Sequence, residues 1–168
     1  AKYAVNEGEA KTAAILRNVE NDYSVGLANY FKEAFVKLTG TPDSIVATLD
    51  YVKDTQDFTA QLTTLVNKKV DVIFAPGDYN QVAILIKQAR QLGIEAPFMG
   101  GDTLDAPEFF EIGGEDVEGV VITNHYSPEA PVTNVSREFV DAYKNEYNKD
   151  ANAFAALGFD AYKVIINA

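Results

Sequence analysis

Two kinds of apolar pattern alternate along the chain. Short, nearly continuous apolar runs occupy residues 12–16, 45–49, 70–75, 97–99 and 120–123. Each is followed by a stretch in which apolar residues return every three or four positions, as they do on a helix. Strands without polar alternation are buried on both faces, which is typical of a parallel sheet covered by helices. The alternation predicts right-handed βαβ units and a three-layer, doubly wound α/β domain with strand order 2-1-3-4-5.

Helical periodicity is clearest after the first apolar run. Residues 23–38 are predicted to form a helix that Gly40 ends and Pro42 prevents from continuing. Its apolar face is expected to hold Leu27, Tyr30, Phe31, Ala34, Phe35 and Leu38. Similar spacing predicts helices over residues 58–66, 82–92, 135–147 and 154–165, a brief one over 105–112, and the end of a helix at residues 2–7. The segment 125–133, which holds two prolines, is the longest apparent loop and is expected to be a crossing or hinge segment.

Composition excludes several classes of partner and chemistry. A formal net charge of -11 repels phosphate backbones, so nucleic acid is not expected as a partner. The chain has no cysteine, which removes disulfides and thiolate chemistry. It contains no apolar run of about 18 residues, so direct membrane insertion is not expected.

Length and the ends of the chain bear on its organisation. A chain of 168 residues, 47% of them apolar, suits one domain with a real core. It opens at Ala1 without a methionine and stops at Ala168 inside a helical pattern. We therefore expect residues 1–168 to be a piece of a longer protein.

Polar and aromatic side chains follow three of the predicted strands. Tyr23 comes after the first, Asp78 and Tyr79 after the third, and Asp102 after the fourth. The carboxyl ends of parallel strands share one edge, and open sheets bind ligands in the crevice outside it. Carboxylates and tyrosines without a nucleophile or a lysine favour a site for a small cation such as the ammonium group of an amino acid.

Each of these residues also has a structural explanation. Asp78 is placed to cap the next helix, and capping is the stronger interpretation of that residue. Tyr79 has no such local explanation and is the better ligand candidate. For Asp102, capping by it or by Thr103 and ligand binding are equally supported, while Tyr23 is either a surface residue that supports its loop or a ring facing a ligand.

Glycines accompany the candidate residues at two of the strand ends. Gly77 permits close backbone approach or a positive φ, and Gly100 and Gly101 are expected to clear side chains from the crevice before Asp102.

Catalytic signatures are absent from the sequence. It has no phosphate-binding G-x-x-x-x-G-K-[ST] loop, no G-x-G-x-x-G fingerprint, no G-x-S-x-G elbow and no metal-ligand cluster. His125 is the only histidine, and we assign it no catalytic role. We expect neither an enzyme nor a cofactor.

In its motifs and their order, the chain resembles the second lobe of type I periplasmic binding proteins of branched-chain amino acid ABC importers. The resemblance covers nearly the whole chain, and it implies that residues 1–168 are a single ligand-binding lobe, a fragment of a larger two-lobe protein. The segments that carry it are KTAAILRNVENDYSVGLANYFKEAF, the T-x-D-F segment at 55–58, VDVIFAPGDYNQVAILIKQARQLG, FMGGD at 98–102 and ALGFDAY at 156–162.

The resemblance implies roles for particular residues. Asp102 matches the acidic residue that meets the α-ammonium of the ligand, and Tyr23 and Tyr79 match aromatic residues at the cleft. Phe159 lies where several relatives carry a tyrosine near the cleft. Phenylalanine keeps the ring but lacks the hydroxyl, so it cannot donate the hydrogen bond expected of a tyrosine there.

The resemblance also implies a biological role. Two lobes would close on an amino acid, and the closed form would dock on a membrane permease. The protein would work outside the cytoplasm, in the periplasm or as a cell-surface lipoprotein. It would be made as a precursor with a signal peptide. A ligand-sensing domain of a receptor or a transcription regulator is the alternative. A phosphoacceptor receiver domain shares the strand order. Such a domain needs a lysine after its fifth strand, and no lysine closely follows Thr123.

Overall fold

The computed structural model describes all 168 residues. The chain divides into two compact units, Ala1–Thr123 and Asn124–Ala168, which are described separately. The expectation that residues 1–168 form a single lobe stays a prediction.

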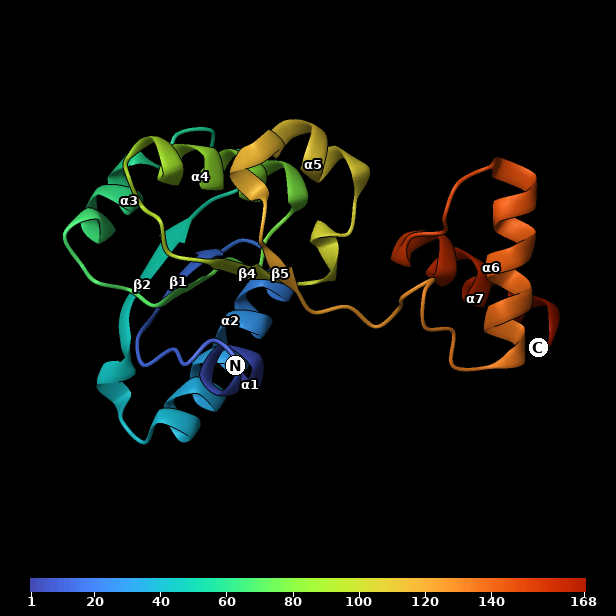
Figure 1. Cartoon of the computed structure of the whole chain (residues 1–168), viewed down its shortest axis with the longest axis horizontal. Helices are drawn as coiled ribbons and strands as arrows, with labels where there is room; N and C mark the ends of the chain where they lie inside the picture. The colour runs from blue at the N-terminus through green and yellow to red at the C-terminus, as the bar shows by residue number, and fades with distance from the viewer. The chain divides into compact units, whose positions relative to one another are not determined.

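A five-stranded parallel sheet forms the centre of the first unit (Figure 1). Its strands lie in the order β2-β1-β3-β4-β5, which confirms the predicted topology. They are β1 (Ala13–Asn18), β2 (Ile45–Tyr51), β3 (Val72–Phe74), β4 (Phe98–Gly100) and β5 (Val121–Ile122). All residues of β3 and β4 are buried, because their sequences VIF and FMG face helices on both sides.

Two apolar clusters cover the two faces of this sheet. On one face, α1 (Lys2–Asn6) and α2 (Asp22–Thr39) contribute Ala4, Phe31 and Phe35 to a cluster with residues of β1, β3 and β4. On the other face, α3 (Thr59–Val66), α4 (Tyr79–Gln91) and α5 (Pro107–Gly113) pack on the sheet through residues such as Leu62, Leu85 and Phe109. Short 3-10 turns complete the unit at η1 (Pro42–Ser44), η2 (Asp102–Leu104) and η3 (Gly114–Val117).

Helix α2 illustrates how local sequence sets its ends. The Asn21 side chain accepts a hydrogen bond from Ser24 N, and Gly40 ends the helix at a φ of 78°. The buried face consists of Ser24, Ala28, Phe31 and Phe35. Tyr30, which was expected on this face, is 73% exposed, because it lies about a third of a turn away from the buried line.

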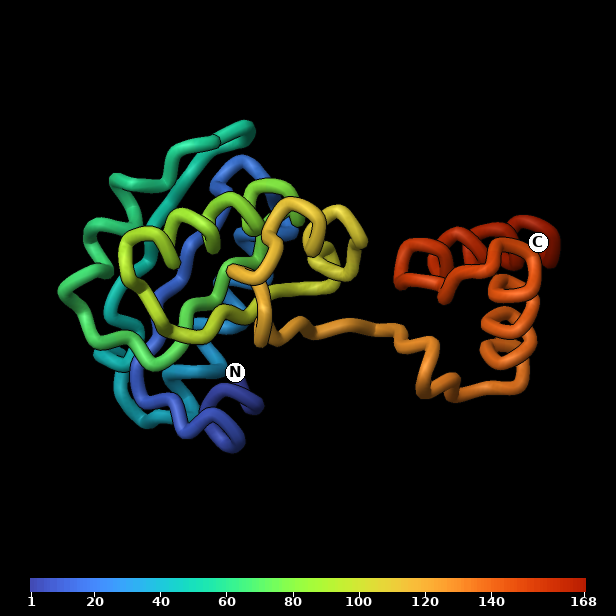
Figure 2. Tube along the Cα trace, turned by 45° about the horizontal axis from the view of Figure 1, so that its top comes forward, coloured from blue at the N-terminus to red at the C-terminus, as the bar shows by residue number.

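The second unit is a pair of helices joined to the sheet unit by a segment without helix or strand (Figures 1 and 2). Thr133 caps α6 (Asn134–Tyr147), and Asn152 caps α7 (Ala153–Ile166). Both helices were predicted from their periodicity.

None of the helices is both long and apolar enough to cross a membrane.

Candidate functional site

The carboxyl edge of the sheet in the first unit brings together two of the predicted site residues. Tyr23 lies in the first turn of α2, just after β1, and Asp102 opens η2, just after β4. The Tyr23 hydroxyl donates a hydrogen bond to Asp102 Oδ1 at 2.5 Å. Both residues are half-buried, so the bond is partly shielded from water.

The environment of Tyr23 keeps its phenol protonated. Burial, the hydrogen bond to Asp102 and the charge of Asp102 together raise the pKa of Tyr23 to about 12, although Thr103 opposes the shift. The phenol is therefore a donor to the carboxylate at any physiological pH.

Glycines at the strand ends make room for side chains of the protein itself. A Cβ on Gly101 would lie 2.0 Å from the Tyr23 hydroxyl oxygen, and a Cβ on Gly100 would lie 2.3 Å from Leu104 Cδ1. The expectation that these glycines clear the crevice is thus corrected in one respect, since the space they leave is filled by Tyr23 and Leu104. Substituting Gly101 would displace the donor that holds Asp102.

The interpretation of Asp102 as a helix cap is wrong. Its carboxylate accepts from Tyr23, and α5 begins five residues later with Ala106 at its N-cap and no side-chain cap. Thr103 does not cap that helix either, because its hydroxyl donates to the Gly77 carbonyl at 2.6 Å. This bond joins the loop after β4 to the loop after β3.

Asp78 occupies the N-cap position of α4, as expected, but its side chain makes no capping hydrogen bond. The capping interpretation therefore fails as an account of its carboxylate. Asp78 instead lines a shallow groove of about 240 Å³ at this sheet edge, with Lys53, Asp54, Tyr79, Asn80 and Gln81. Pockets that enclose small molecules usually measure about 300–1,000 Å³, so this groove is too small to enclose one alone.

Tyr79 begins α4 and is half-buried. Its ring packs against the apolar cluster beneath α3, α4 and α5. The residue therefore has a local packing role that the sequence did not reveal, and its predicted contact with a ligand stays a prediction.

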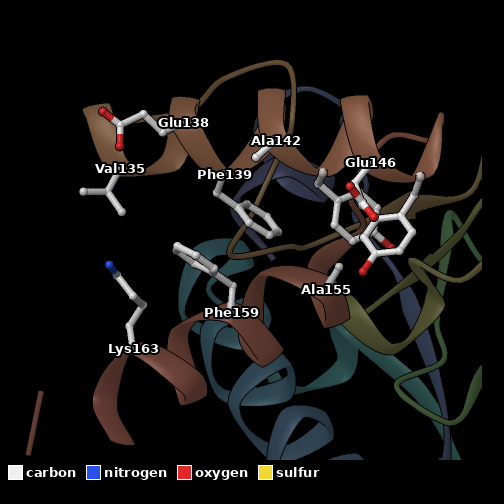
Figure 3. Close-up of a pocket in the computed structure, with 10 residues that line it drawn as sticks. Val135, Glu138, Phe139, Ala142, Glu146, Ala155, Phe159 and Lys163 are labelled. Atoms are coloured by element: carbon white, nitrogen blue, oxygen red, sulfur yellow. The ribbon is translucent and has the colours of Figure 1, made fainter. Parts of the chain in front are cut away.

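Phe159 belongs to the second unit. Its ring stacks on Phe139 with centroids 4.7 Å apart, and Lys163 Nζ lies 5.7 Å from the ring centroid. These residues line a groove of about 650 Å³ between α6 and α7 (Figure 3). These contacts do not test the predicted role of Phe159 near a ligand-binding cleft.

Two residues at the sheet edge were not predicted from the sequence to be site residues. Thr103 was considered only as a cap, and Tyr51 was not considered. Tyr51 ends β2, is 3% exposed, and its hydroxyl has no hydrogen-bond partner. That hydroxyl would lie 2.2 Å from a Cβ on Gly77, and burial, assisted by the charge of Asp78, raises the pKa of Tyr51. The only feature of the sequence that could have indicated Tyr51 is its position just after the second apolar run.

This arrangement favours binding over catalysis. A phenol-supported carboxylate accepts hydrogen bonds from a cation, and charge-assisted bonds of this kind are the stronger ones. No group of three or more His, Cys, Asp or Glu side chains is placed to hold a metal ion.

Comparison with known proteins gives a consistent result along the whole chain. The family model described as "Periplasmic binding protein" matches residues 1–168. A curated Leu/Ile/Val-binding protein from Rhizobium johnstonii is 30% identical over 98% of this chain and 43% of its own length.

Solved structures extend this similarity to the fold. A leucine-binding protein from Thermotoga maritima matches with a TM-score of 0.91 and 40% identity, over 99% of this chain and 46% of its own. A branched-chain amino acid transporter substrate-binding protein from Streptococcus pneumoniae, solved with isoleucine, matches with a TM-score of 0.87 and 32% identity over 99% and 47%. The chain thus spans somewhat less than half the length of these relatives.

Proposed function

Because the chain belongs to the periplasmic binding protein family, with the type I fold of its branched-chain amino acid-binding members, we propose that it is part of the substrate-binding component of an ABC importer. Proteins of this family are not enzymes; they bind substrates. The proposed ligand is a branched-chain or similarly apolar amino acid, and the proposed partner is a membrane permease. The proposed location of the protein is outside the cytoplasm.

The observation that carries this proposal is the hydrogen bond between Tyr23 and Asp102 at the carboxyl edge of the sheet. A carboxylate fixed there presents negative charge to the crevice in which open α/β sheets bind ligands. A free amino acid always carries an ammonium group at neutral pH, so Asp102 is its proposed partner. Tyr79 and Asp78 from the neighbouring strand end, and Phe159, are proposed as further ligand contacts.

The apolar character of the ligand rests on the relatives. The curated protein from Rhizobium johnstonii is named for leucine, isoleucine and valine, and the Streptococcus pneumoniae structure contains isoleucine. The whole protein's ligand is inferred from them by similarity.

A two-lobe protein would account for the small groove at the sheet edge. A lobe that supplies one wall of an interlobe cleft presents an open half-site, and hinge closure of a second lobe would complete it. The relatives' greater length leaves room for such a lobe.

The second unit also supports a larger protein. It exposes more than half the surface of several large apolar residues, which are Val132, Tyr147, Tyr162, Val164, Ile165 and Ile166. A unit this short buries little core by itself, so we propose that other parts of the full-length protein cover this surface.

The test is ligand binding by the full-length protein after removal of endogenous ligand by unfolding and refolding. We expect leucine, isoleucine or valine to release or absorb heat in calorimetry and to raise the melting temperature. The α-keto analogue of leucine, which lacks the ammonium group, should bind at least about 30-fold more weakly, since about 2 kcal/mol depends on that group. Absence of binding by every amino acid would refute the proposal, and equal affinity for the keto analogue would refute the role of Asp102.

A further inference from the structure

We propose that Thr103 is a positioning residue for ligand binding, which holds the Asp102 carboxylate in place by anchoring the loop after β4 to the loop after β3. This inference rests on the proposed function, because it assigns to Thr103 the support of the ammonium-binding carboxylate.

The anchor is a short hydrogen bond between two strand ends. Thr103 Oγ1 donates to the carbonyl oxygen of Gly77 at 2.6 Å, and the two residues are 26 positions apart. Thr103 is half-buried and Gly77 is buried, so water competes weakly for this bond. Since Asp102 is the neighbouring residue in η2, its backbone cannot shift without breaking the anchor.

The acceptor of this bond is itself held in place. The Tyr51 hydroxyl occupies the space beside Gly77, where a Cβ would lie 2.2 Å from it and 3.1 Å from Val82 Cγ2. The ring of Tyr51 is fixed in turn by an edge contact with Phe58, at a centroid distance of 5.2 Å. The loop after β3 therefore rests on the packed interior beneath α3 and α4.

Asp102 is also held through its side chain. The Tyr23 hydroxyl donates its single hydrogen to Asp102 Oδ1 at 2.5 Å.

A carboxylate held from two sides is preorganised for an incoming cation. Ordering a side chain during binding lowers affinity, so a group that is already ordered binds more tightly. We expect Thr103→Val, which keeps the shape and removes the hydroxyl, to weaken binding of L-leucine about 10-fold, as the loss of one hydrogen bond predicts. Thr103→Ser, which keeps the hydroxyl, should remain within about 3-fold of wild type.

Calorimetric titration of the full-length protein with L-leucine, L-isoleucine and L-valine tests the inference. The matched control is Thr63→Val on α3, whose hydroxyl also donates to a backbone carbonyl at 2.6 Å but within its own helix. It should leave affinity unchanged. If Thr103→Val does not fold, Thr103→Ala replaces it in the same comparison with Thr103→Ser.

A double-mutant cycle separates positioning from a general structural effect. If Thr103 acts through Asp102, Thr103→Val should weaken binding by less than about 2-fold in an Asp102→Asn background. Equal weakening in both backgrounds, or wild-type affinity of Thr103→Val, would overturn the inference while leaving the proposed function intact. Failure of the wild-type protein to bind any of the three ligands would overturn the proposed function and this inference together.

Discussion

The phenol of Tyr23 donates a 2.5 Å hydrogen bond to Asp102, which lies 79 residues further along the chain. The bond joins the first turn of α2 to the end of β4, two elements on separate strand ends of one sheet. Local sequence could assign Asp102 to a helix cap, but this bond instead holds its carboxylate at the carboxyl edge of the sheet, where open α/β sheets bind ligands.

Removing the carboxylate of Asp102 should weaken amino acid binding strongly. Asp102→Ala in the full-length protein is expected to cost about 2–5 kcal/mol, because the ammonium group would lose its charged partner in a desolvated cleft. Calorimetry with L-leucine measures the change. Glu108→Gln removes a charge from the exposed first turn of α5 and serves as the control. Unchanged affinity of Asp102→Ala would remove Asp102 from the site.

Adding one methyl group at Gly101 should damage the site. Gly101→Ala places a Cβ 2.0 Å from the Tyr23 hydroxyl and 3.0 Å from Leu27 Cδ1, so Tyr23 must leave Asp102. We expect a loss of stability of about 1–3 kcal/mol by overpacking, together with weaker ligand binding. Urea unfolding and calorimetry measure the two effects.

The matched control is Gly26→Ala, within α2, where nothing lies within 4 Å of the added Cβ. Here alanine should stabilise the protein by about 0.5–1 kcal/mol, because it favours the helix more than glycine does. If both substitutions had the same effect on stability, steric conflict with Tyr23 would not be the cause.

Tyr51→Phe should stabilise the protein rather than weaken it. The Tyr51 hydroxyl is buried and has no partner, and burying an unpaired polar group is costly. Phenylalanine keeps the ring contact with Phe58. We expect a gain of about 1 kcal/mol in urea unfolding, whereas a comparable loss would show that the hydroxyl is satisfied by buried water.

Asp71 should contribute a pH-dependent part of the stability. Its Oδ2 accepts hydrogen bonds from Lys11 N, Thr12 N and Thr12 Oγ1. Burial opposes ionisation, but these bonds and the charge of Lys11 outweigh it and hold the pKa of Asp71 below its ordinary value of 3.8. Because the folded pKa is the lower one, the unfolded chain binds the proton more readily.

The contribution of Asp71 is therefore complete above the ordinary pKa and is lost as the pH falls through the folded-state pKa. Asp71→Asn should cost about 1 kcal/mol at pH 7, a modest value because the side chain is exposed, and the difference from wild type should shrink below about pH 4. Urea unfolding at several pH values measures this. The exposed Glu33→Gln on α2 is the control, and a difference that grows toward low pH would contradict the assignment.

Phe35 should be essential to the cluster on the α2 face of the sheet. It is fully buried and stacks on Phe31, whose ring stacks on Phe74. Phe35→Ala is expected to cost about 3–5 kcal/mol in urea unfolding. Tyr30→Ala on the same helix, where the ring is 73% exposed, should change stability by less than about 0.5 kcal/mol.

The elements and topology of the first unit followed from the sequence alone. Apolar runs such as VDVIFA indicate strands that are buried on both faces, and apolar residues repeated every three or four positions, as in α4, indicate helices that cover the sheet on one face. Parallel strands then place Tyr23, Asp78, Tyr79 and Asp102 at one edge, since successive βαβ units run in the same direction. For this reason the strand order, and the sheet edge at which these residues lie, could be predicted without knowing a single side-chain contact.

Only the tertiary structure decided what the side chains at that edge do. Sequence periodicity did not show that Asp102 bonds Tyr23, that Asp78 leaves its helix uncapped, or that Gly77 and Gly101 make room for Tyr51 and Tyr23. Each of these outcomes depends on two or more loops that meet in space although they are distant in the chain. Hydrogen bonds and close contacts are sensitive to shifts of a few tenths of an ångström, whereas the local pattern of apolar residues specifies only which face of an element is buried.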